Sequence, residues 1–203
     1  MKTINTYINE KLHLTAKRQY TCQPKSKKEL QDIILQRIKD DGNECDLNDI
    51  DVSKITDMSD LFTTYDNKIF KNFNGDISQW DVSNVKNMYA MFFECANFNK
   101  DISQWNVSNV EDMNGMFLRC SKFNCDISGW DVSNAKYMTE MFYECKNFNC
   151  DISRWNVSNV KGMMSMFKGC KKFNQNLDTW DVSNVEIMED AFDGCPTKPK
   201  WYV

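Results

Sequence analysis

The sequence contains few residues that interrupt regular structure, with 3 prolines and 7 glycines among 203 residues. It has one histidine, His13, and no run close to the roughly 20 apolar residues that a membrane-spanning helix needs. So few scattered glycines exclude a phosphate-binding loop. The lone histidine, without an obvious nucleophile partner, argues against a Ser–His–Asp site. We therefore expect no enzyme, no cofactor and no membrane segment.

The net charge is small, at −4, but charge is unevenly distributed along the chain. Residues 1–45 hold 9 Lys and Arg against 6 Asp and Glu, whereas residues 46–203 hold 16 against 23. A nucleic-acid binder needs a basic surface to displace the counterions of the phosphates. The acidic excess therefore predicts no nucleic-acid partner and favours another protein with a cationic surface.

Nine cysteines, an odd number, argue against a fully paired disulfide framework. Residues 1–9 have no apolar run of the length that a signal peptide needs. These features predict a cytoplasmic protein with reduced thiols, and we expect it to be a monomer.

The main positive feature is an internal repeat of 25 residues. Tryptophan recurs at this interval, and a divergent first copy, five residues longer, begins at Asp46 with Ile50 in the place of Trp. Six copies end at Cys195, and Pro196 interrupts the pattern. We therefore divide the chain into an N-terminal helical cap (1–45), a six-repeat solenoid (46–195) and a C-terminal cap or tail (196–203). The repeated tryptophans are Trp80, Trp105, Trp130, Trp155 and Trp180.

Each unit has two halves with different apolar spacing. The spacing Ile77-x-x-Trp80-x-Val82 is typical of leucine-rich repeats and predicts a short strand. The following residues, from Val85 to Cys95, are apolar at i, i+3, i+6, i+7 and i+10, which predicts a helix. The fold expected is therefore α/β, a leucine-rich-repeat-like β/α solenoid of about six 25-residue repeats with a helical N-terminal cap.

The ends of the chain lie outside the repeat. Ser26 and Glu29 have the spacing of a capping box, and Gly42 is a natural stop, which predicts a helix between them. Ile4, Tyr7, Ile8 and Leu12 indicate an earlier helix. At the other end, Trp201, Tyr202 and Val203 are expected to fold over the last coil.

The unit Asp-Ile-Ser-x-Trp-[Asp/Asn]-Val-Ser-Asn-Val-x-x-Met-x-x-Met-Phe-x-x-Cys-x-x-Phe-Asn covers about three quarters of the chain. It resembles the BspA-like leucine-rich-repeat proteins, and in particular their 25-residue subfamily, first noted in mycoplasma surface lipoproteins and found in other bacteria and phages. The resemblance implies a leucine-rich-repeat-like solenoid and protein–protein interaction, often as a surface adhesin.

The repeated polar and sulfur residues each allow a structural and a chemical interpretation. The cysteines at one repeat position are expected to be buried as small hydrophobic residues. Cys120 and Cys125, and likewise Cys145 and Cys150, form Cys-x4-Cys pairs, so zinc binding and oxidation between coils stay open. The Asp and Asn columns are expected to close turns, with a calcium ladder or contact with a partner as the alternatives.

A binding function should lie at positions where the copies differ. One expected surface, beside the tryptophans, is concave; the other is the outer face of the predicted helices, where large side chains fit a protein contact or packing between helices. The candidate partner-binding residues are Gln79, Gln104, Arg154, Asp81, Asp131 and Asp181 on the first, and Phe93, Leu118, Tyr137 and Tyr143 on the second.

Non-catalytic protein binding is the function that the sequence favours. It covers an intracellular binder or inhibitor of a partner protein, such as one that a phage directs at its host. A bacterial surface adhesin and a metal-stabilised scaffold stay open as alternatives.

Overall fold

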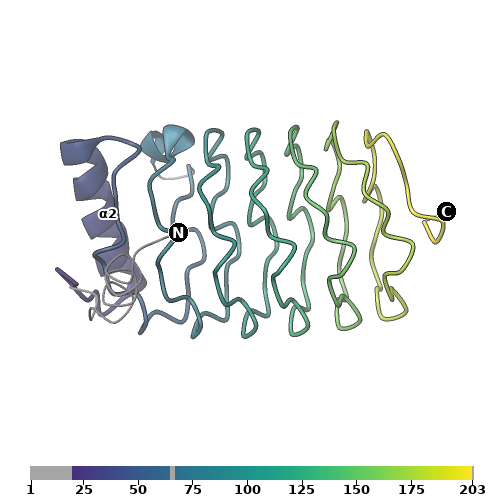
Figure 1. Ribbon diagram of the computed structural model, residues 1–203, viewed down its shortest axis with the longest axis horizontal. Helices are drawn as coiled ribbons and strands as arrows, with labels where there is room; N and C mark the ends of the chain where they lie inside the picture. The colour runs from purple at the N-terminus through teal and green to yellow at the C-terminus, as the bar shows by residue number, and fades with distance from the viewer. Residues whose placement is uncertain (1–19, 65–66, 203) are drawn as a thin grey trace, which may run out of the picture.

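A computed structural model describes residues 20–64 and 67–202 of the chain. The repeats form coils that lie side by side in a row from the N-terminal helix to the C-terminus (Figure 1). Two helices occur in the described residues, α2 (Lys27–Asp41) and the 3-10 helix η1 (Lys68–Asn72). Between coils, the described residues form isolated parallel β-bridges only, and no extended strand. His13 and the earlier helix expected around Ile4–Leu12 lie outside the described residues.

Each coil has three segments, which we define on the second repeat. The turn segment is 76–85, the pairing segment 86–95 and the closing segment 96–100, and equivalent segments of successive coils form three strips along the molecule. In the turn segment, Trp80 N–H donates to Ile77 O at 3.1 Å and Val85 N–H to Val82 O at 2.9 Å. Two tight turns therefore take the place of the expected strand.

The pairing segment joins neighbouring coils through its backbone. Alternate N–H groups donate to the next coil, as from Ala90 to Asn114 O at 2.8 Å and from Phe92 to Met116 O at 2.9 Å. The intervening groups close turns within the segment, as from Met91 to Met88 O at 3.2 Å. Ala90 and Glu94 have φ of 49° and 59°, a left-handed conformation that interrupts any right-handed helix.

Inward-facing residues stack in columns that run through all the coils. Phe92 stacks on Phe98 within its coil at 4.1 Å between ring centroids, and on Phe117 of the next coil at 5.5 Å. Each repeat tryptophan is buried and its indole N–H donates to a carbonyl of the preceding coil, as from Trp105 to Ile77 O at 3.1 Å. One continuous aromatic core therefore holds the row together.

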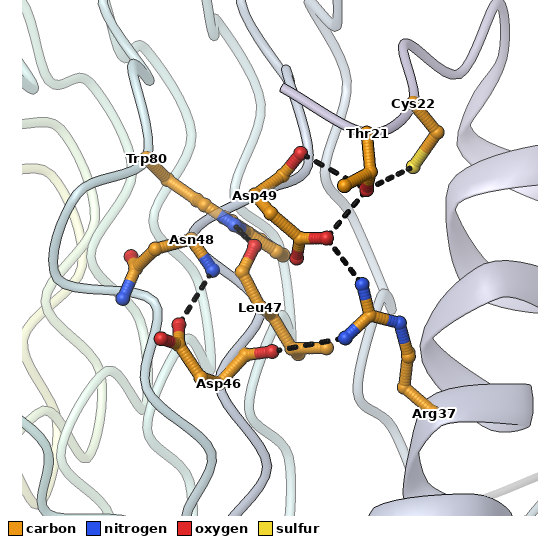
Figure 2. Close-up of polar contacts among 8 residues, drawn as sticks. All are labelled: Thr21, Cys22, Arg37, Asp46, Leu47, Asn48, Asp49 and Trp80. Carbon is orange, nitrogen blue, oxygen red and sulfur yellow. Dashed lines mark hydrogen bonds and ion pairs between the residues drawn. The ribbon is translucent and has the colours of Figure 1, made fainter. Parts of the chain in front are cut away.

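At the N-terminal end, α2 lies against the first coil (Figure 1). Ser26 caps the helix by accepting from Glu29 N–H at 3.2 Å, and Gly42 ends it, so the helix has the predicted bounds. Arg37 of α2 contacts Asp46 O at 3.4 Å and the carboxylate of Asp49, to which Thr21 also donates (Figure 2). The helix thereby closes off the polar backbone of the first coil.

At the C-terminal end, the last described residues imitate the start of another coil. The indole N–H of Trp201 donates to Leu177 O at 2.8 Å, as that of each repeat tryptophan does to the coil before it. Trp201 and Tyr202 both contact Phe192, with ring centroids at 5.7 and 5.1 Å. The expectation that these two residues fold over the last coil is confirmed, while Val203 lies outside the described residues.

The predicted fold class, a β/α solenoid with a helical N-terminal cap, is wrong. The described part of the chain has one α-helix, no sheet, and turns where both the repeat strand and the repeat helix were expected. Consecutive turns ending at Met91, Cys95 and Phe98 give nearly the same apolar spacing as a helix. The apolar period alone could therefore not distinguish the two, and the left-handed residues decide the outcome. No helix in the described residues is long and apolar enough to cross a membrane.

Candidate functional site

Exposed apolar side chains gather on the pairing strip. The described residues include five large hydrophobic side chains that are exposed, and four of them belong to pairing segments. They are Tyr89 and Tyr137, each 44% exposed, Met164 at 40% and Ile187 at 49%. They come from four of the six coils and from two repeat positions that are two residues apart, so the strip presents an interrupted apolar line along the molecule. Clustered exposed apolar residues of this kind mark contact surfaces.

A second line of large residues runs beside the first. Phe93 is buried, with 7% exposure, whereas Leu118 and Tyr143 are half-buried. A hollow of about 220 Å³ lies among Tyr89, Phe93 and Leu118. Of the four pairing-strip residues predicted from the sequence, only Tyr137 is therefore exposed, and Phe93 contributes the floor of the hollow.

Charged residues border these apolar groups and pair across coils. Arg119 contacts Glu94 at 2.6 Å and Lys136 contacts Glu111 at 2.6 Å. The hydrogen bond from Arg119 lowers the pKa of the Glu94 carboxyl. In the last five pairing segments, 9 Asp and Glu stand against 5 Lys and Arg. The strip therefore has an excess of negative charge, because its acidic residues outnumber the lysines and Arg119 that pair with some of them.

The turn strip holds the other group of candidates, and its carboxylates have a structural role. Asp81, Asp131 and Asp181 are exposed, and each accepts from the N–H of the serine two residues later at 3.0–3.1 Å. Such side-chain bonds close tight turns. Gln79, Gln104 and Arg154 are exposed beside them. Gln79 N–H donates to Asn48 Oδ1 of the coil before at 2.8 Å.

The repeat-position thiols lie in the core and donate to the backbone. Cys120 donates to Phe92 O at 2.9 Å, and Cys145 to Phe117 O at 2.9 Å. Burial raises the pKa of both thiols well above the usual range. A buried, protonated thiol is a poor nucleophile and a poor metal ligand.

The second cysteine of each Cys-x4-Cys pair contacts a different group. Cys125 sulfur accepts from Ile102 N–H at 3.4 Å, and Cys150 sulfur from Ile127 N–H at 3.3 Å. Among the described residues, no group of three or more His, Cys, Asp or Glu is arranged to hold a metal ion. All nine cysteines are present as free thiols.

Comparison with known protein families gives a match. The family model described as "Mycoplasma protein of unknown function, DUF285" matches residues 34–149 and 104–200. The chain belongs to this family. No curated protein and no solved structure matches the chain.

In this DUF285 chain, sequence reasoning missed two residues of the apolar line. Met164 and Ile187 are exposed at the same repeat positions as Tyr89 and Tyr137, respectively. An alignment of the six copies would have identified Met164 and Ile187. At these two repeat positions the other copies hold, apart from the two tyrosines, polar residues or glycine, so a large apolar residue there is unusual.

Proposed function

We propose that the protein binds another protein through its pairing strip and has no catalytic activity. The observation that carries the proposal is that four of the five exposed large hydrophobic side chains in the described residues lie on this strip. Aromatic residues and Met are enriched at protein interfaces. The acidic residues around them fit a partner with a cationic surface, since complementary charge speeds and orients association.

Two further features support this kind of function. The resemblance of the 25-residue unit to BspA-like proteins implies protein–protein interaction, and an adhesin would use the same strip. An odd number of cysteines argues against a fully paired disulfide framework and fits a reducing compartment, which supports a binder or inhibitor that acts in the cytoplasm. We therefore put the intracellular binder first and the adhesin second.

The test compares substitutions on two strips. A photo-reactive amino acid is placed at Tyr89 or at Gln104, and cross-linked proteins from the native host are identified by mass spectrometry. The partner found is then titrated against Tyr89→Ala/Tyr137→Ala and against the control Gln104→Ala/Arg154→Ala. We expect the first pair to lose about tenfold or more in affinity, as interface aromatic residues do, and the control to keep it.

A control pair that loses binding while the tyrosine pair keeps it would move the site to the turn strip and end the proposal. Circular dichroism melts of both double variants check that the coils stay folded. Hydrolytic or transferase activity of the purified protein that survives in every variant would contradict the absence of catalysis.

A further inference from the structure

The closing strip differs in charge from the rest of the molecule. Its segments in the first five coils, residues 71–75, 96–100, 121–125, 146–150 and 171–175, contain six lysines and no Asp, Glu or Arg. Among the described residues, only Lys146 of these six forms an ion pair, with Glu144 at 3.5 Å. A chain with net charge −4 therefore carries a line of lysines along one strip. The lysines are Lys71, Lys100, Lys122, Lys146, Lys171 and Lys172.

A ladder of asparagines lies within the same strip. Asn99 N–H donates to Asn74 Oδ1 at 3.0 Å, and Asn124 N–H donates to Asn99 Oδ1 at 2.7 Å. The ladder continues in the same way through Asn149, whose N–H donates to Asn124 Oδ1 at 2.7 Å. The ladder thus uses the side-chain oxygens, while no acceptor among the described residues takes the side-chain NH₂ groups of Asn74, Asn99 and Asn124. Lysines and these amides together make a surface of hydrogen-bond donors.

The donors border a hollow of about 540 Å³ that extends along the strip. Lys100, Lys122 and several asparagines line it, and Glu44 is the one acidic residue in its lining. The inward side of the strip is closed by Phe73, Phe98 and Phe123, which are fully buried. The hollow therefore offers donors and positive charge, without an apolar anchor.

These properties select the class of ligand. Protein interfaces are built around apolar or aromatic anchors, which the strip lacks. Stacking of unpaired bases needs exposed aromatic rings, and the only aromatic residues of these five segments are buried phenylalanines. The ligand that remains is hydrophilic, anionic and rich in oxygen acceptors.

The neighbouring turn strip limits the width of the ligand. Asp76, Asp101, Asp126 and Asp151 start the turn segments directly after the closing segments, so a row of carboxylates runs beside the lysines. A wide polyanion such as a nucleic-acid duplex would bring phosphates over this row and be repelled. A single narrow chain can follow the lysines, whose coils succeed one another at about 4.8 Å, the spacing of hydrogen-bonded chains.

We propose that the closing strip binds a linear acidic polysaccharide. Carboxylates of the polymer lie against the lysines, and its hydroxyl oxygens accept from the side-chain amides of Asn74, Asn99 and Asn124. This site is separate from the pairing strip, so each proposal can fail without the other.

The test measures binding of fluorescent polygalacturonate oligomers to the full chain. We expect binding that weakens as salt is added, because charge contacts are screened, and none to the neutral polymer dextran. Lys122→Glu/Lys171→Glu should reduce the affinity about tenfold or more. The control Lys86→Glu/Lys161→Glu makes the same charge change at exposed lysines of the pairing strip and should stay within about twofold.

A second variant, Asn124→Asp, separates donor loss from misfolding. Aspartate keeps the oxygen that accepts from Asn149 N–H, removes the NH₂ donor and adds a negative charge. We therefore expect an unchanged fold and weaker polygalacturonate binding. Tighter binding of a 20-base-pair DNA duplex than of polygalacturonate would replace the proposal with a nucleic-acid site. Equal losses in the Lys86/Lys161 control, or no binding of the oligomers at all, would overturn it.

Discussion

The turn strip and the pairing strip of this protein are both exposed, yet they use their polar groups in opposite ways. In the turn strip, side chains close the backbone turns, as Asp131 does with Ser133 N–H. In the pairing strip, the backbone bonds to the next coil by itself, as from Gly115 N–H to Thr139 O at 2.8 Å. Side chains therefore close a turn in every coil of the first strip, whereas in the second they do so in three coils, at Asp57, Asn87 and Asp112.

This difference explains where the copies vary. A side chain that closes a turn can be replaced only by another short acceptor, and the position of Asp131 accordingly holds Asp or Asn in every coil. The position of Tyr137 holds Asp, Asn, Tyr, Gly and Ile in the six coils. A repeat protein can add a binding function without loss of stability at positions where backbone groups already provide the hydrogen bonds that the fold needs.

The largest predicted effects on stability come from substitutions in the core. There, the turn segment and the pairing segment should contribute to a similar extent. Trp130→Ala in the turn segment and Phe142→Ala in the pairing segment each remove a buried aromatic side chain. We expect each to lower the free energy of unfolding by about 3–5 kcal/mol, measured by urea denaturation. A loss confined to one of the two would show that the aromatic columns do not form one core.

On the surface, the two strips should separate. Asp131→Ala removes the acceptor that closes a turn and should cost about 1 kcal/mol. Tyr137→Ala removes a side chain that is 44% exposed and should stay within about 0.5 kcal/mol. Thermal and urea unfolding of both variants provide the measurement, and an equal loss in Tyr137→Ala would remove the distinction between the strips.

The sequence predicted the features that depend on local chemistry. The bounds of α2 followed from Ser26, Glu29 and Gly42, and the Asp column was expected to close turns, which Asp131 and its equivalents do. The fold class was wrong because the apolar spacing from Val85 to Cys95 suits a helix as well as consecutive turns. Left-handed residues such as Ala90 and Glu140 separate the two outcomes, and neither residue type indicates a positive φ.

The candidate site was predicted in part for a similar reason. Tyr137 was recognised because its size contrasts with the polar residues around it. Phe93 was expected on the surface of a helix, whereas the turns place it in the floor of a hollow. The separation of charge into strips could not be read from the net charge, since it depends on which segment of each coil holds the lysines.

Backbone conformation gives a smaller difference between the segments. Ala90, in the pairing segment, has φ of 49°, which costs an L-residue about 1–2 kcal/mol. Ala90→Gly removes this cost but also increases the conformational entropy of the unfolded chain. We therefore expect a net stabilisation of about 0.5 kcal/mol. Ala135, in the turn segment, is also buried but has no positive φ, so Ala135→Gly should destabilise by about 1 kcal/mol. Melting temperatures that change in the same direction would contradict the assigned conformations.

The smallest predicted effect is a change of sign between two carboxylates that share one turn geometry. Asp131 and Asp112 each accept from the N–H two residues later, at 3.0 and 2.9 Å. Hydrogen bonds from Ser133 lower the pKa of Asp131, whereas burial raises the pKa of Asp112. Asparagine occupies both positions in other coils, at Asn106 and Asn87, so it fits both turns.

Replacing each aspartate by asparagine should therefore have opposite results at pH 7. A lowered pKa stabilises the folded state above the unfolded value of about 3.9, so Asp131→Asn should destabilise, and the difference should vanish as the pH falls through the folded pKa. A raised pKa costs stability above the folded pKa, so Asp112→Asn should stabilise, and its gain should disappear below about pH 3.9. Urea unfolding of both variants between pH 3 and pH 7 measures the two curves. Parallel curves would mean that the greater burial of Asp112 does not separate its pKa from that of Asp131.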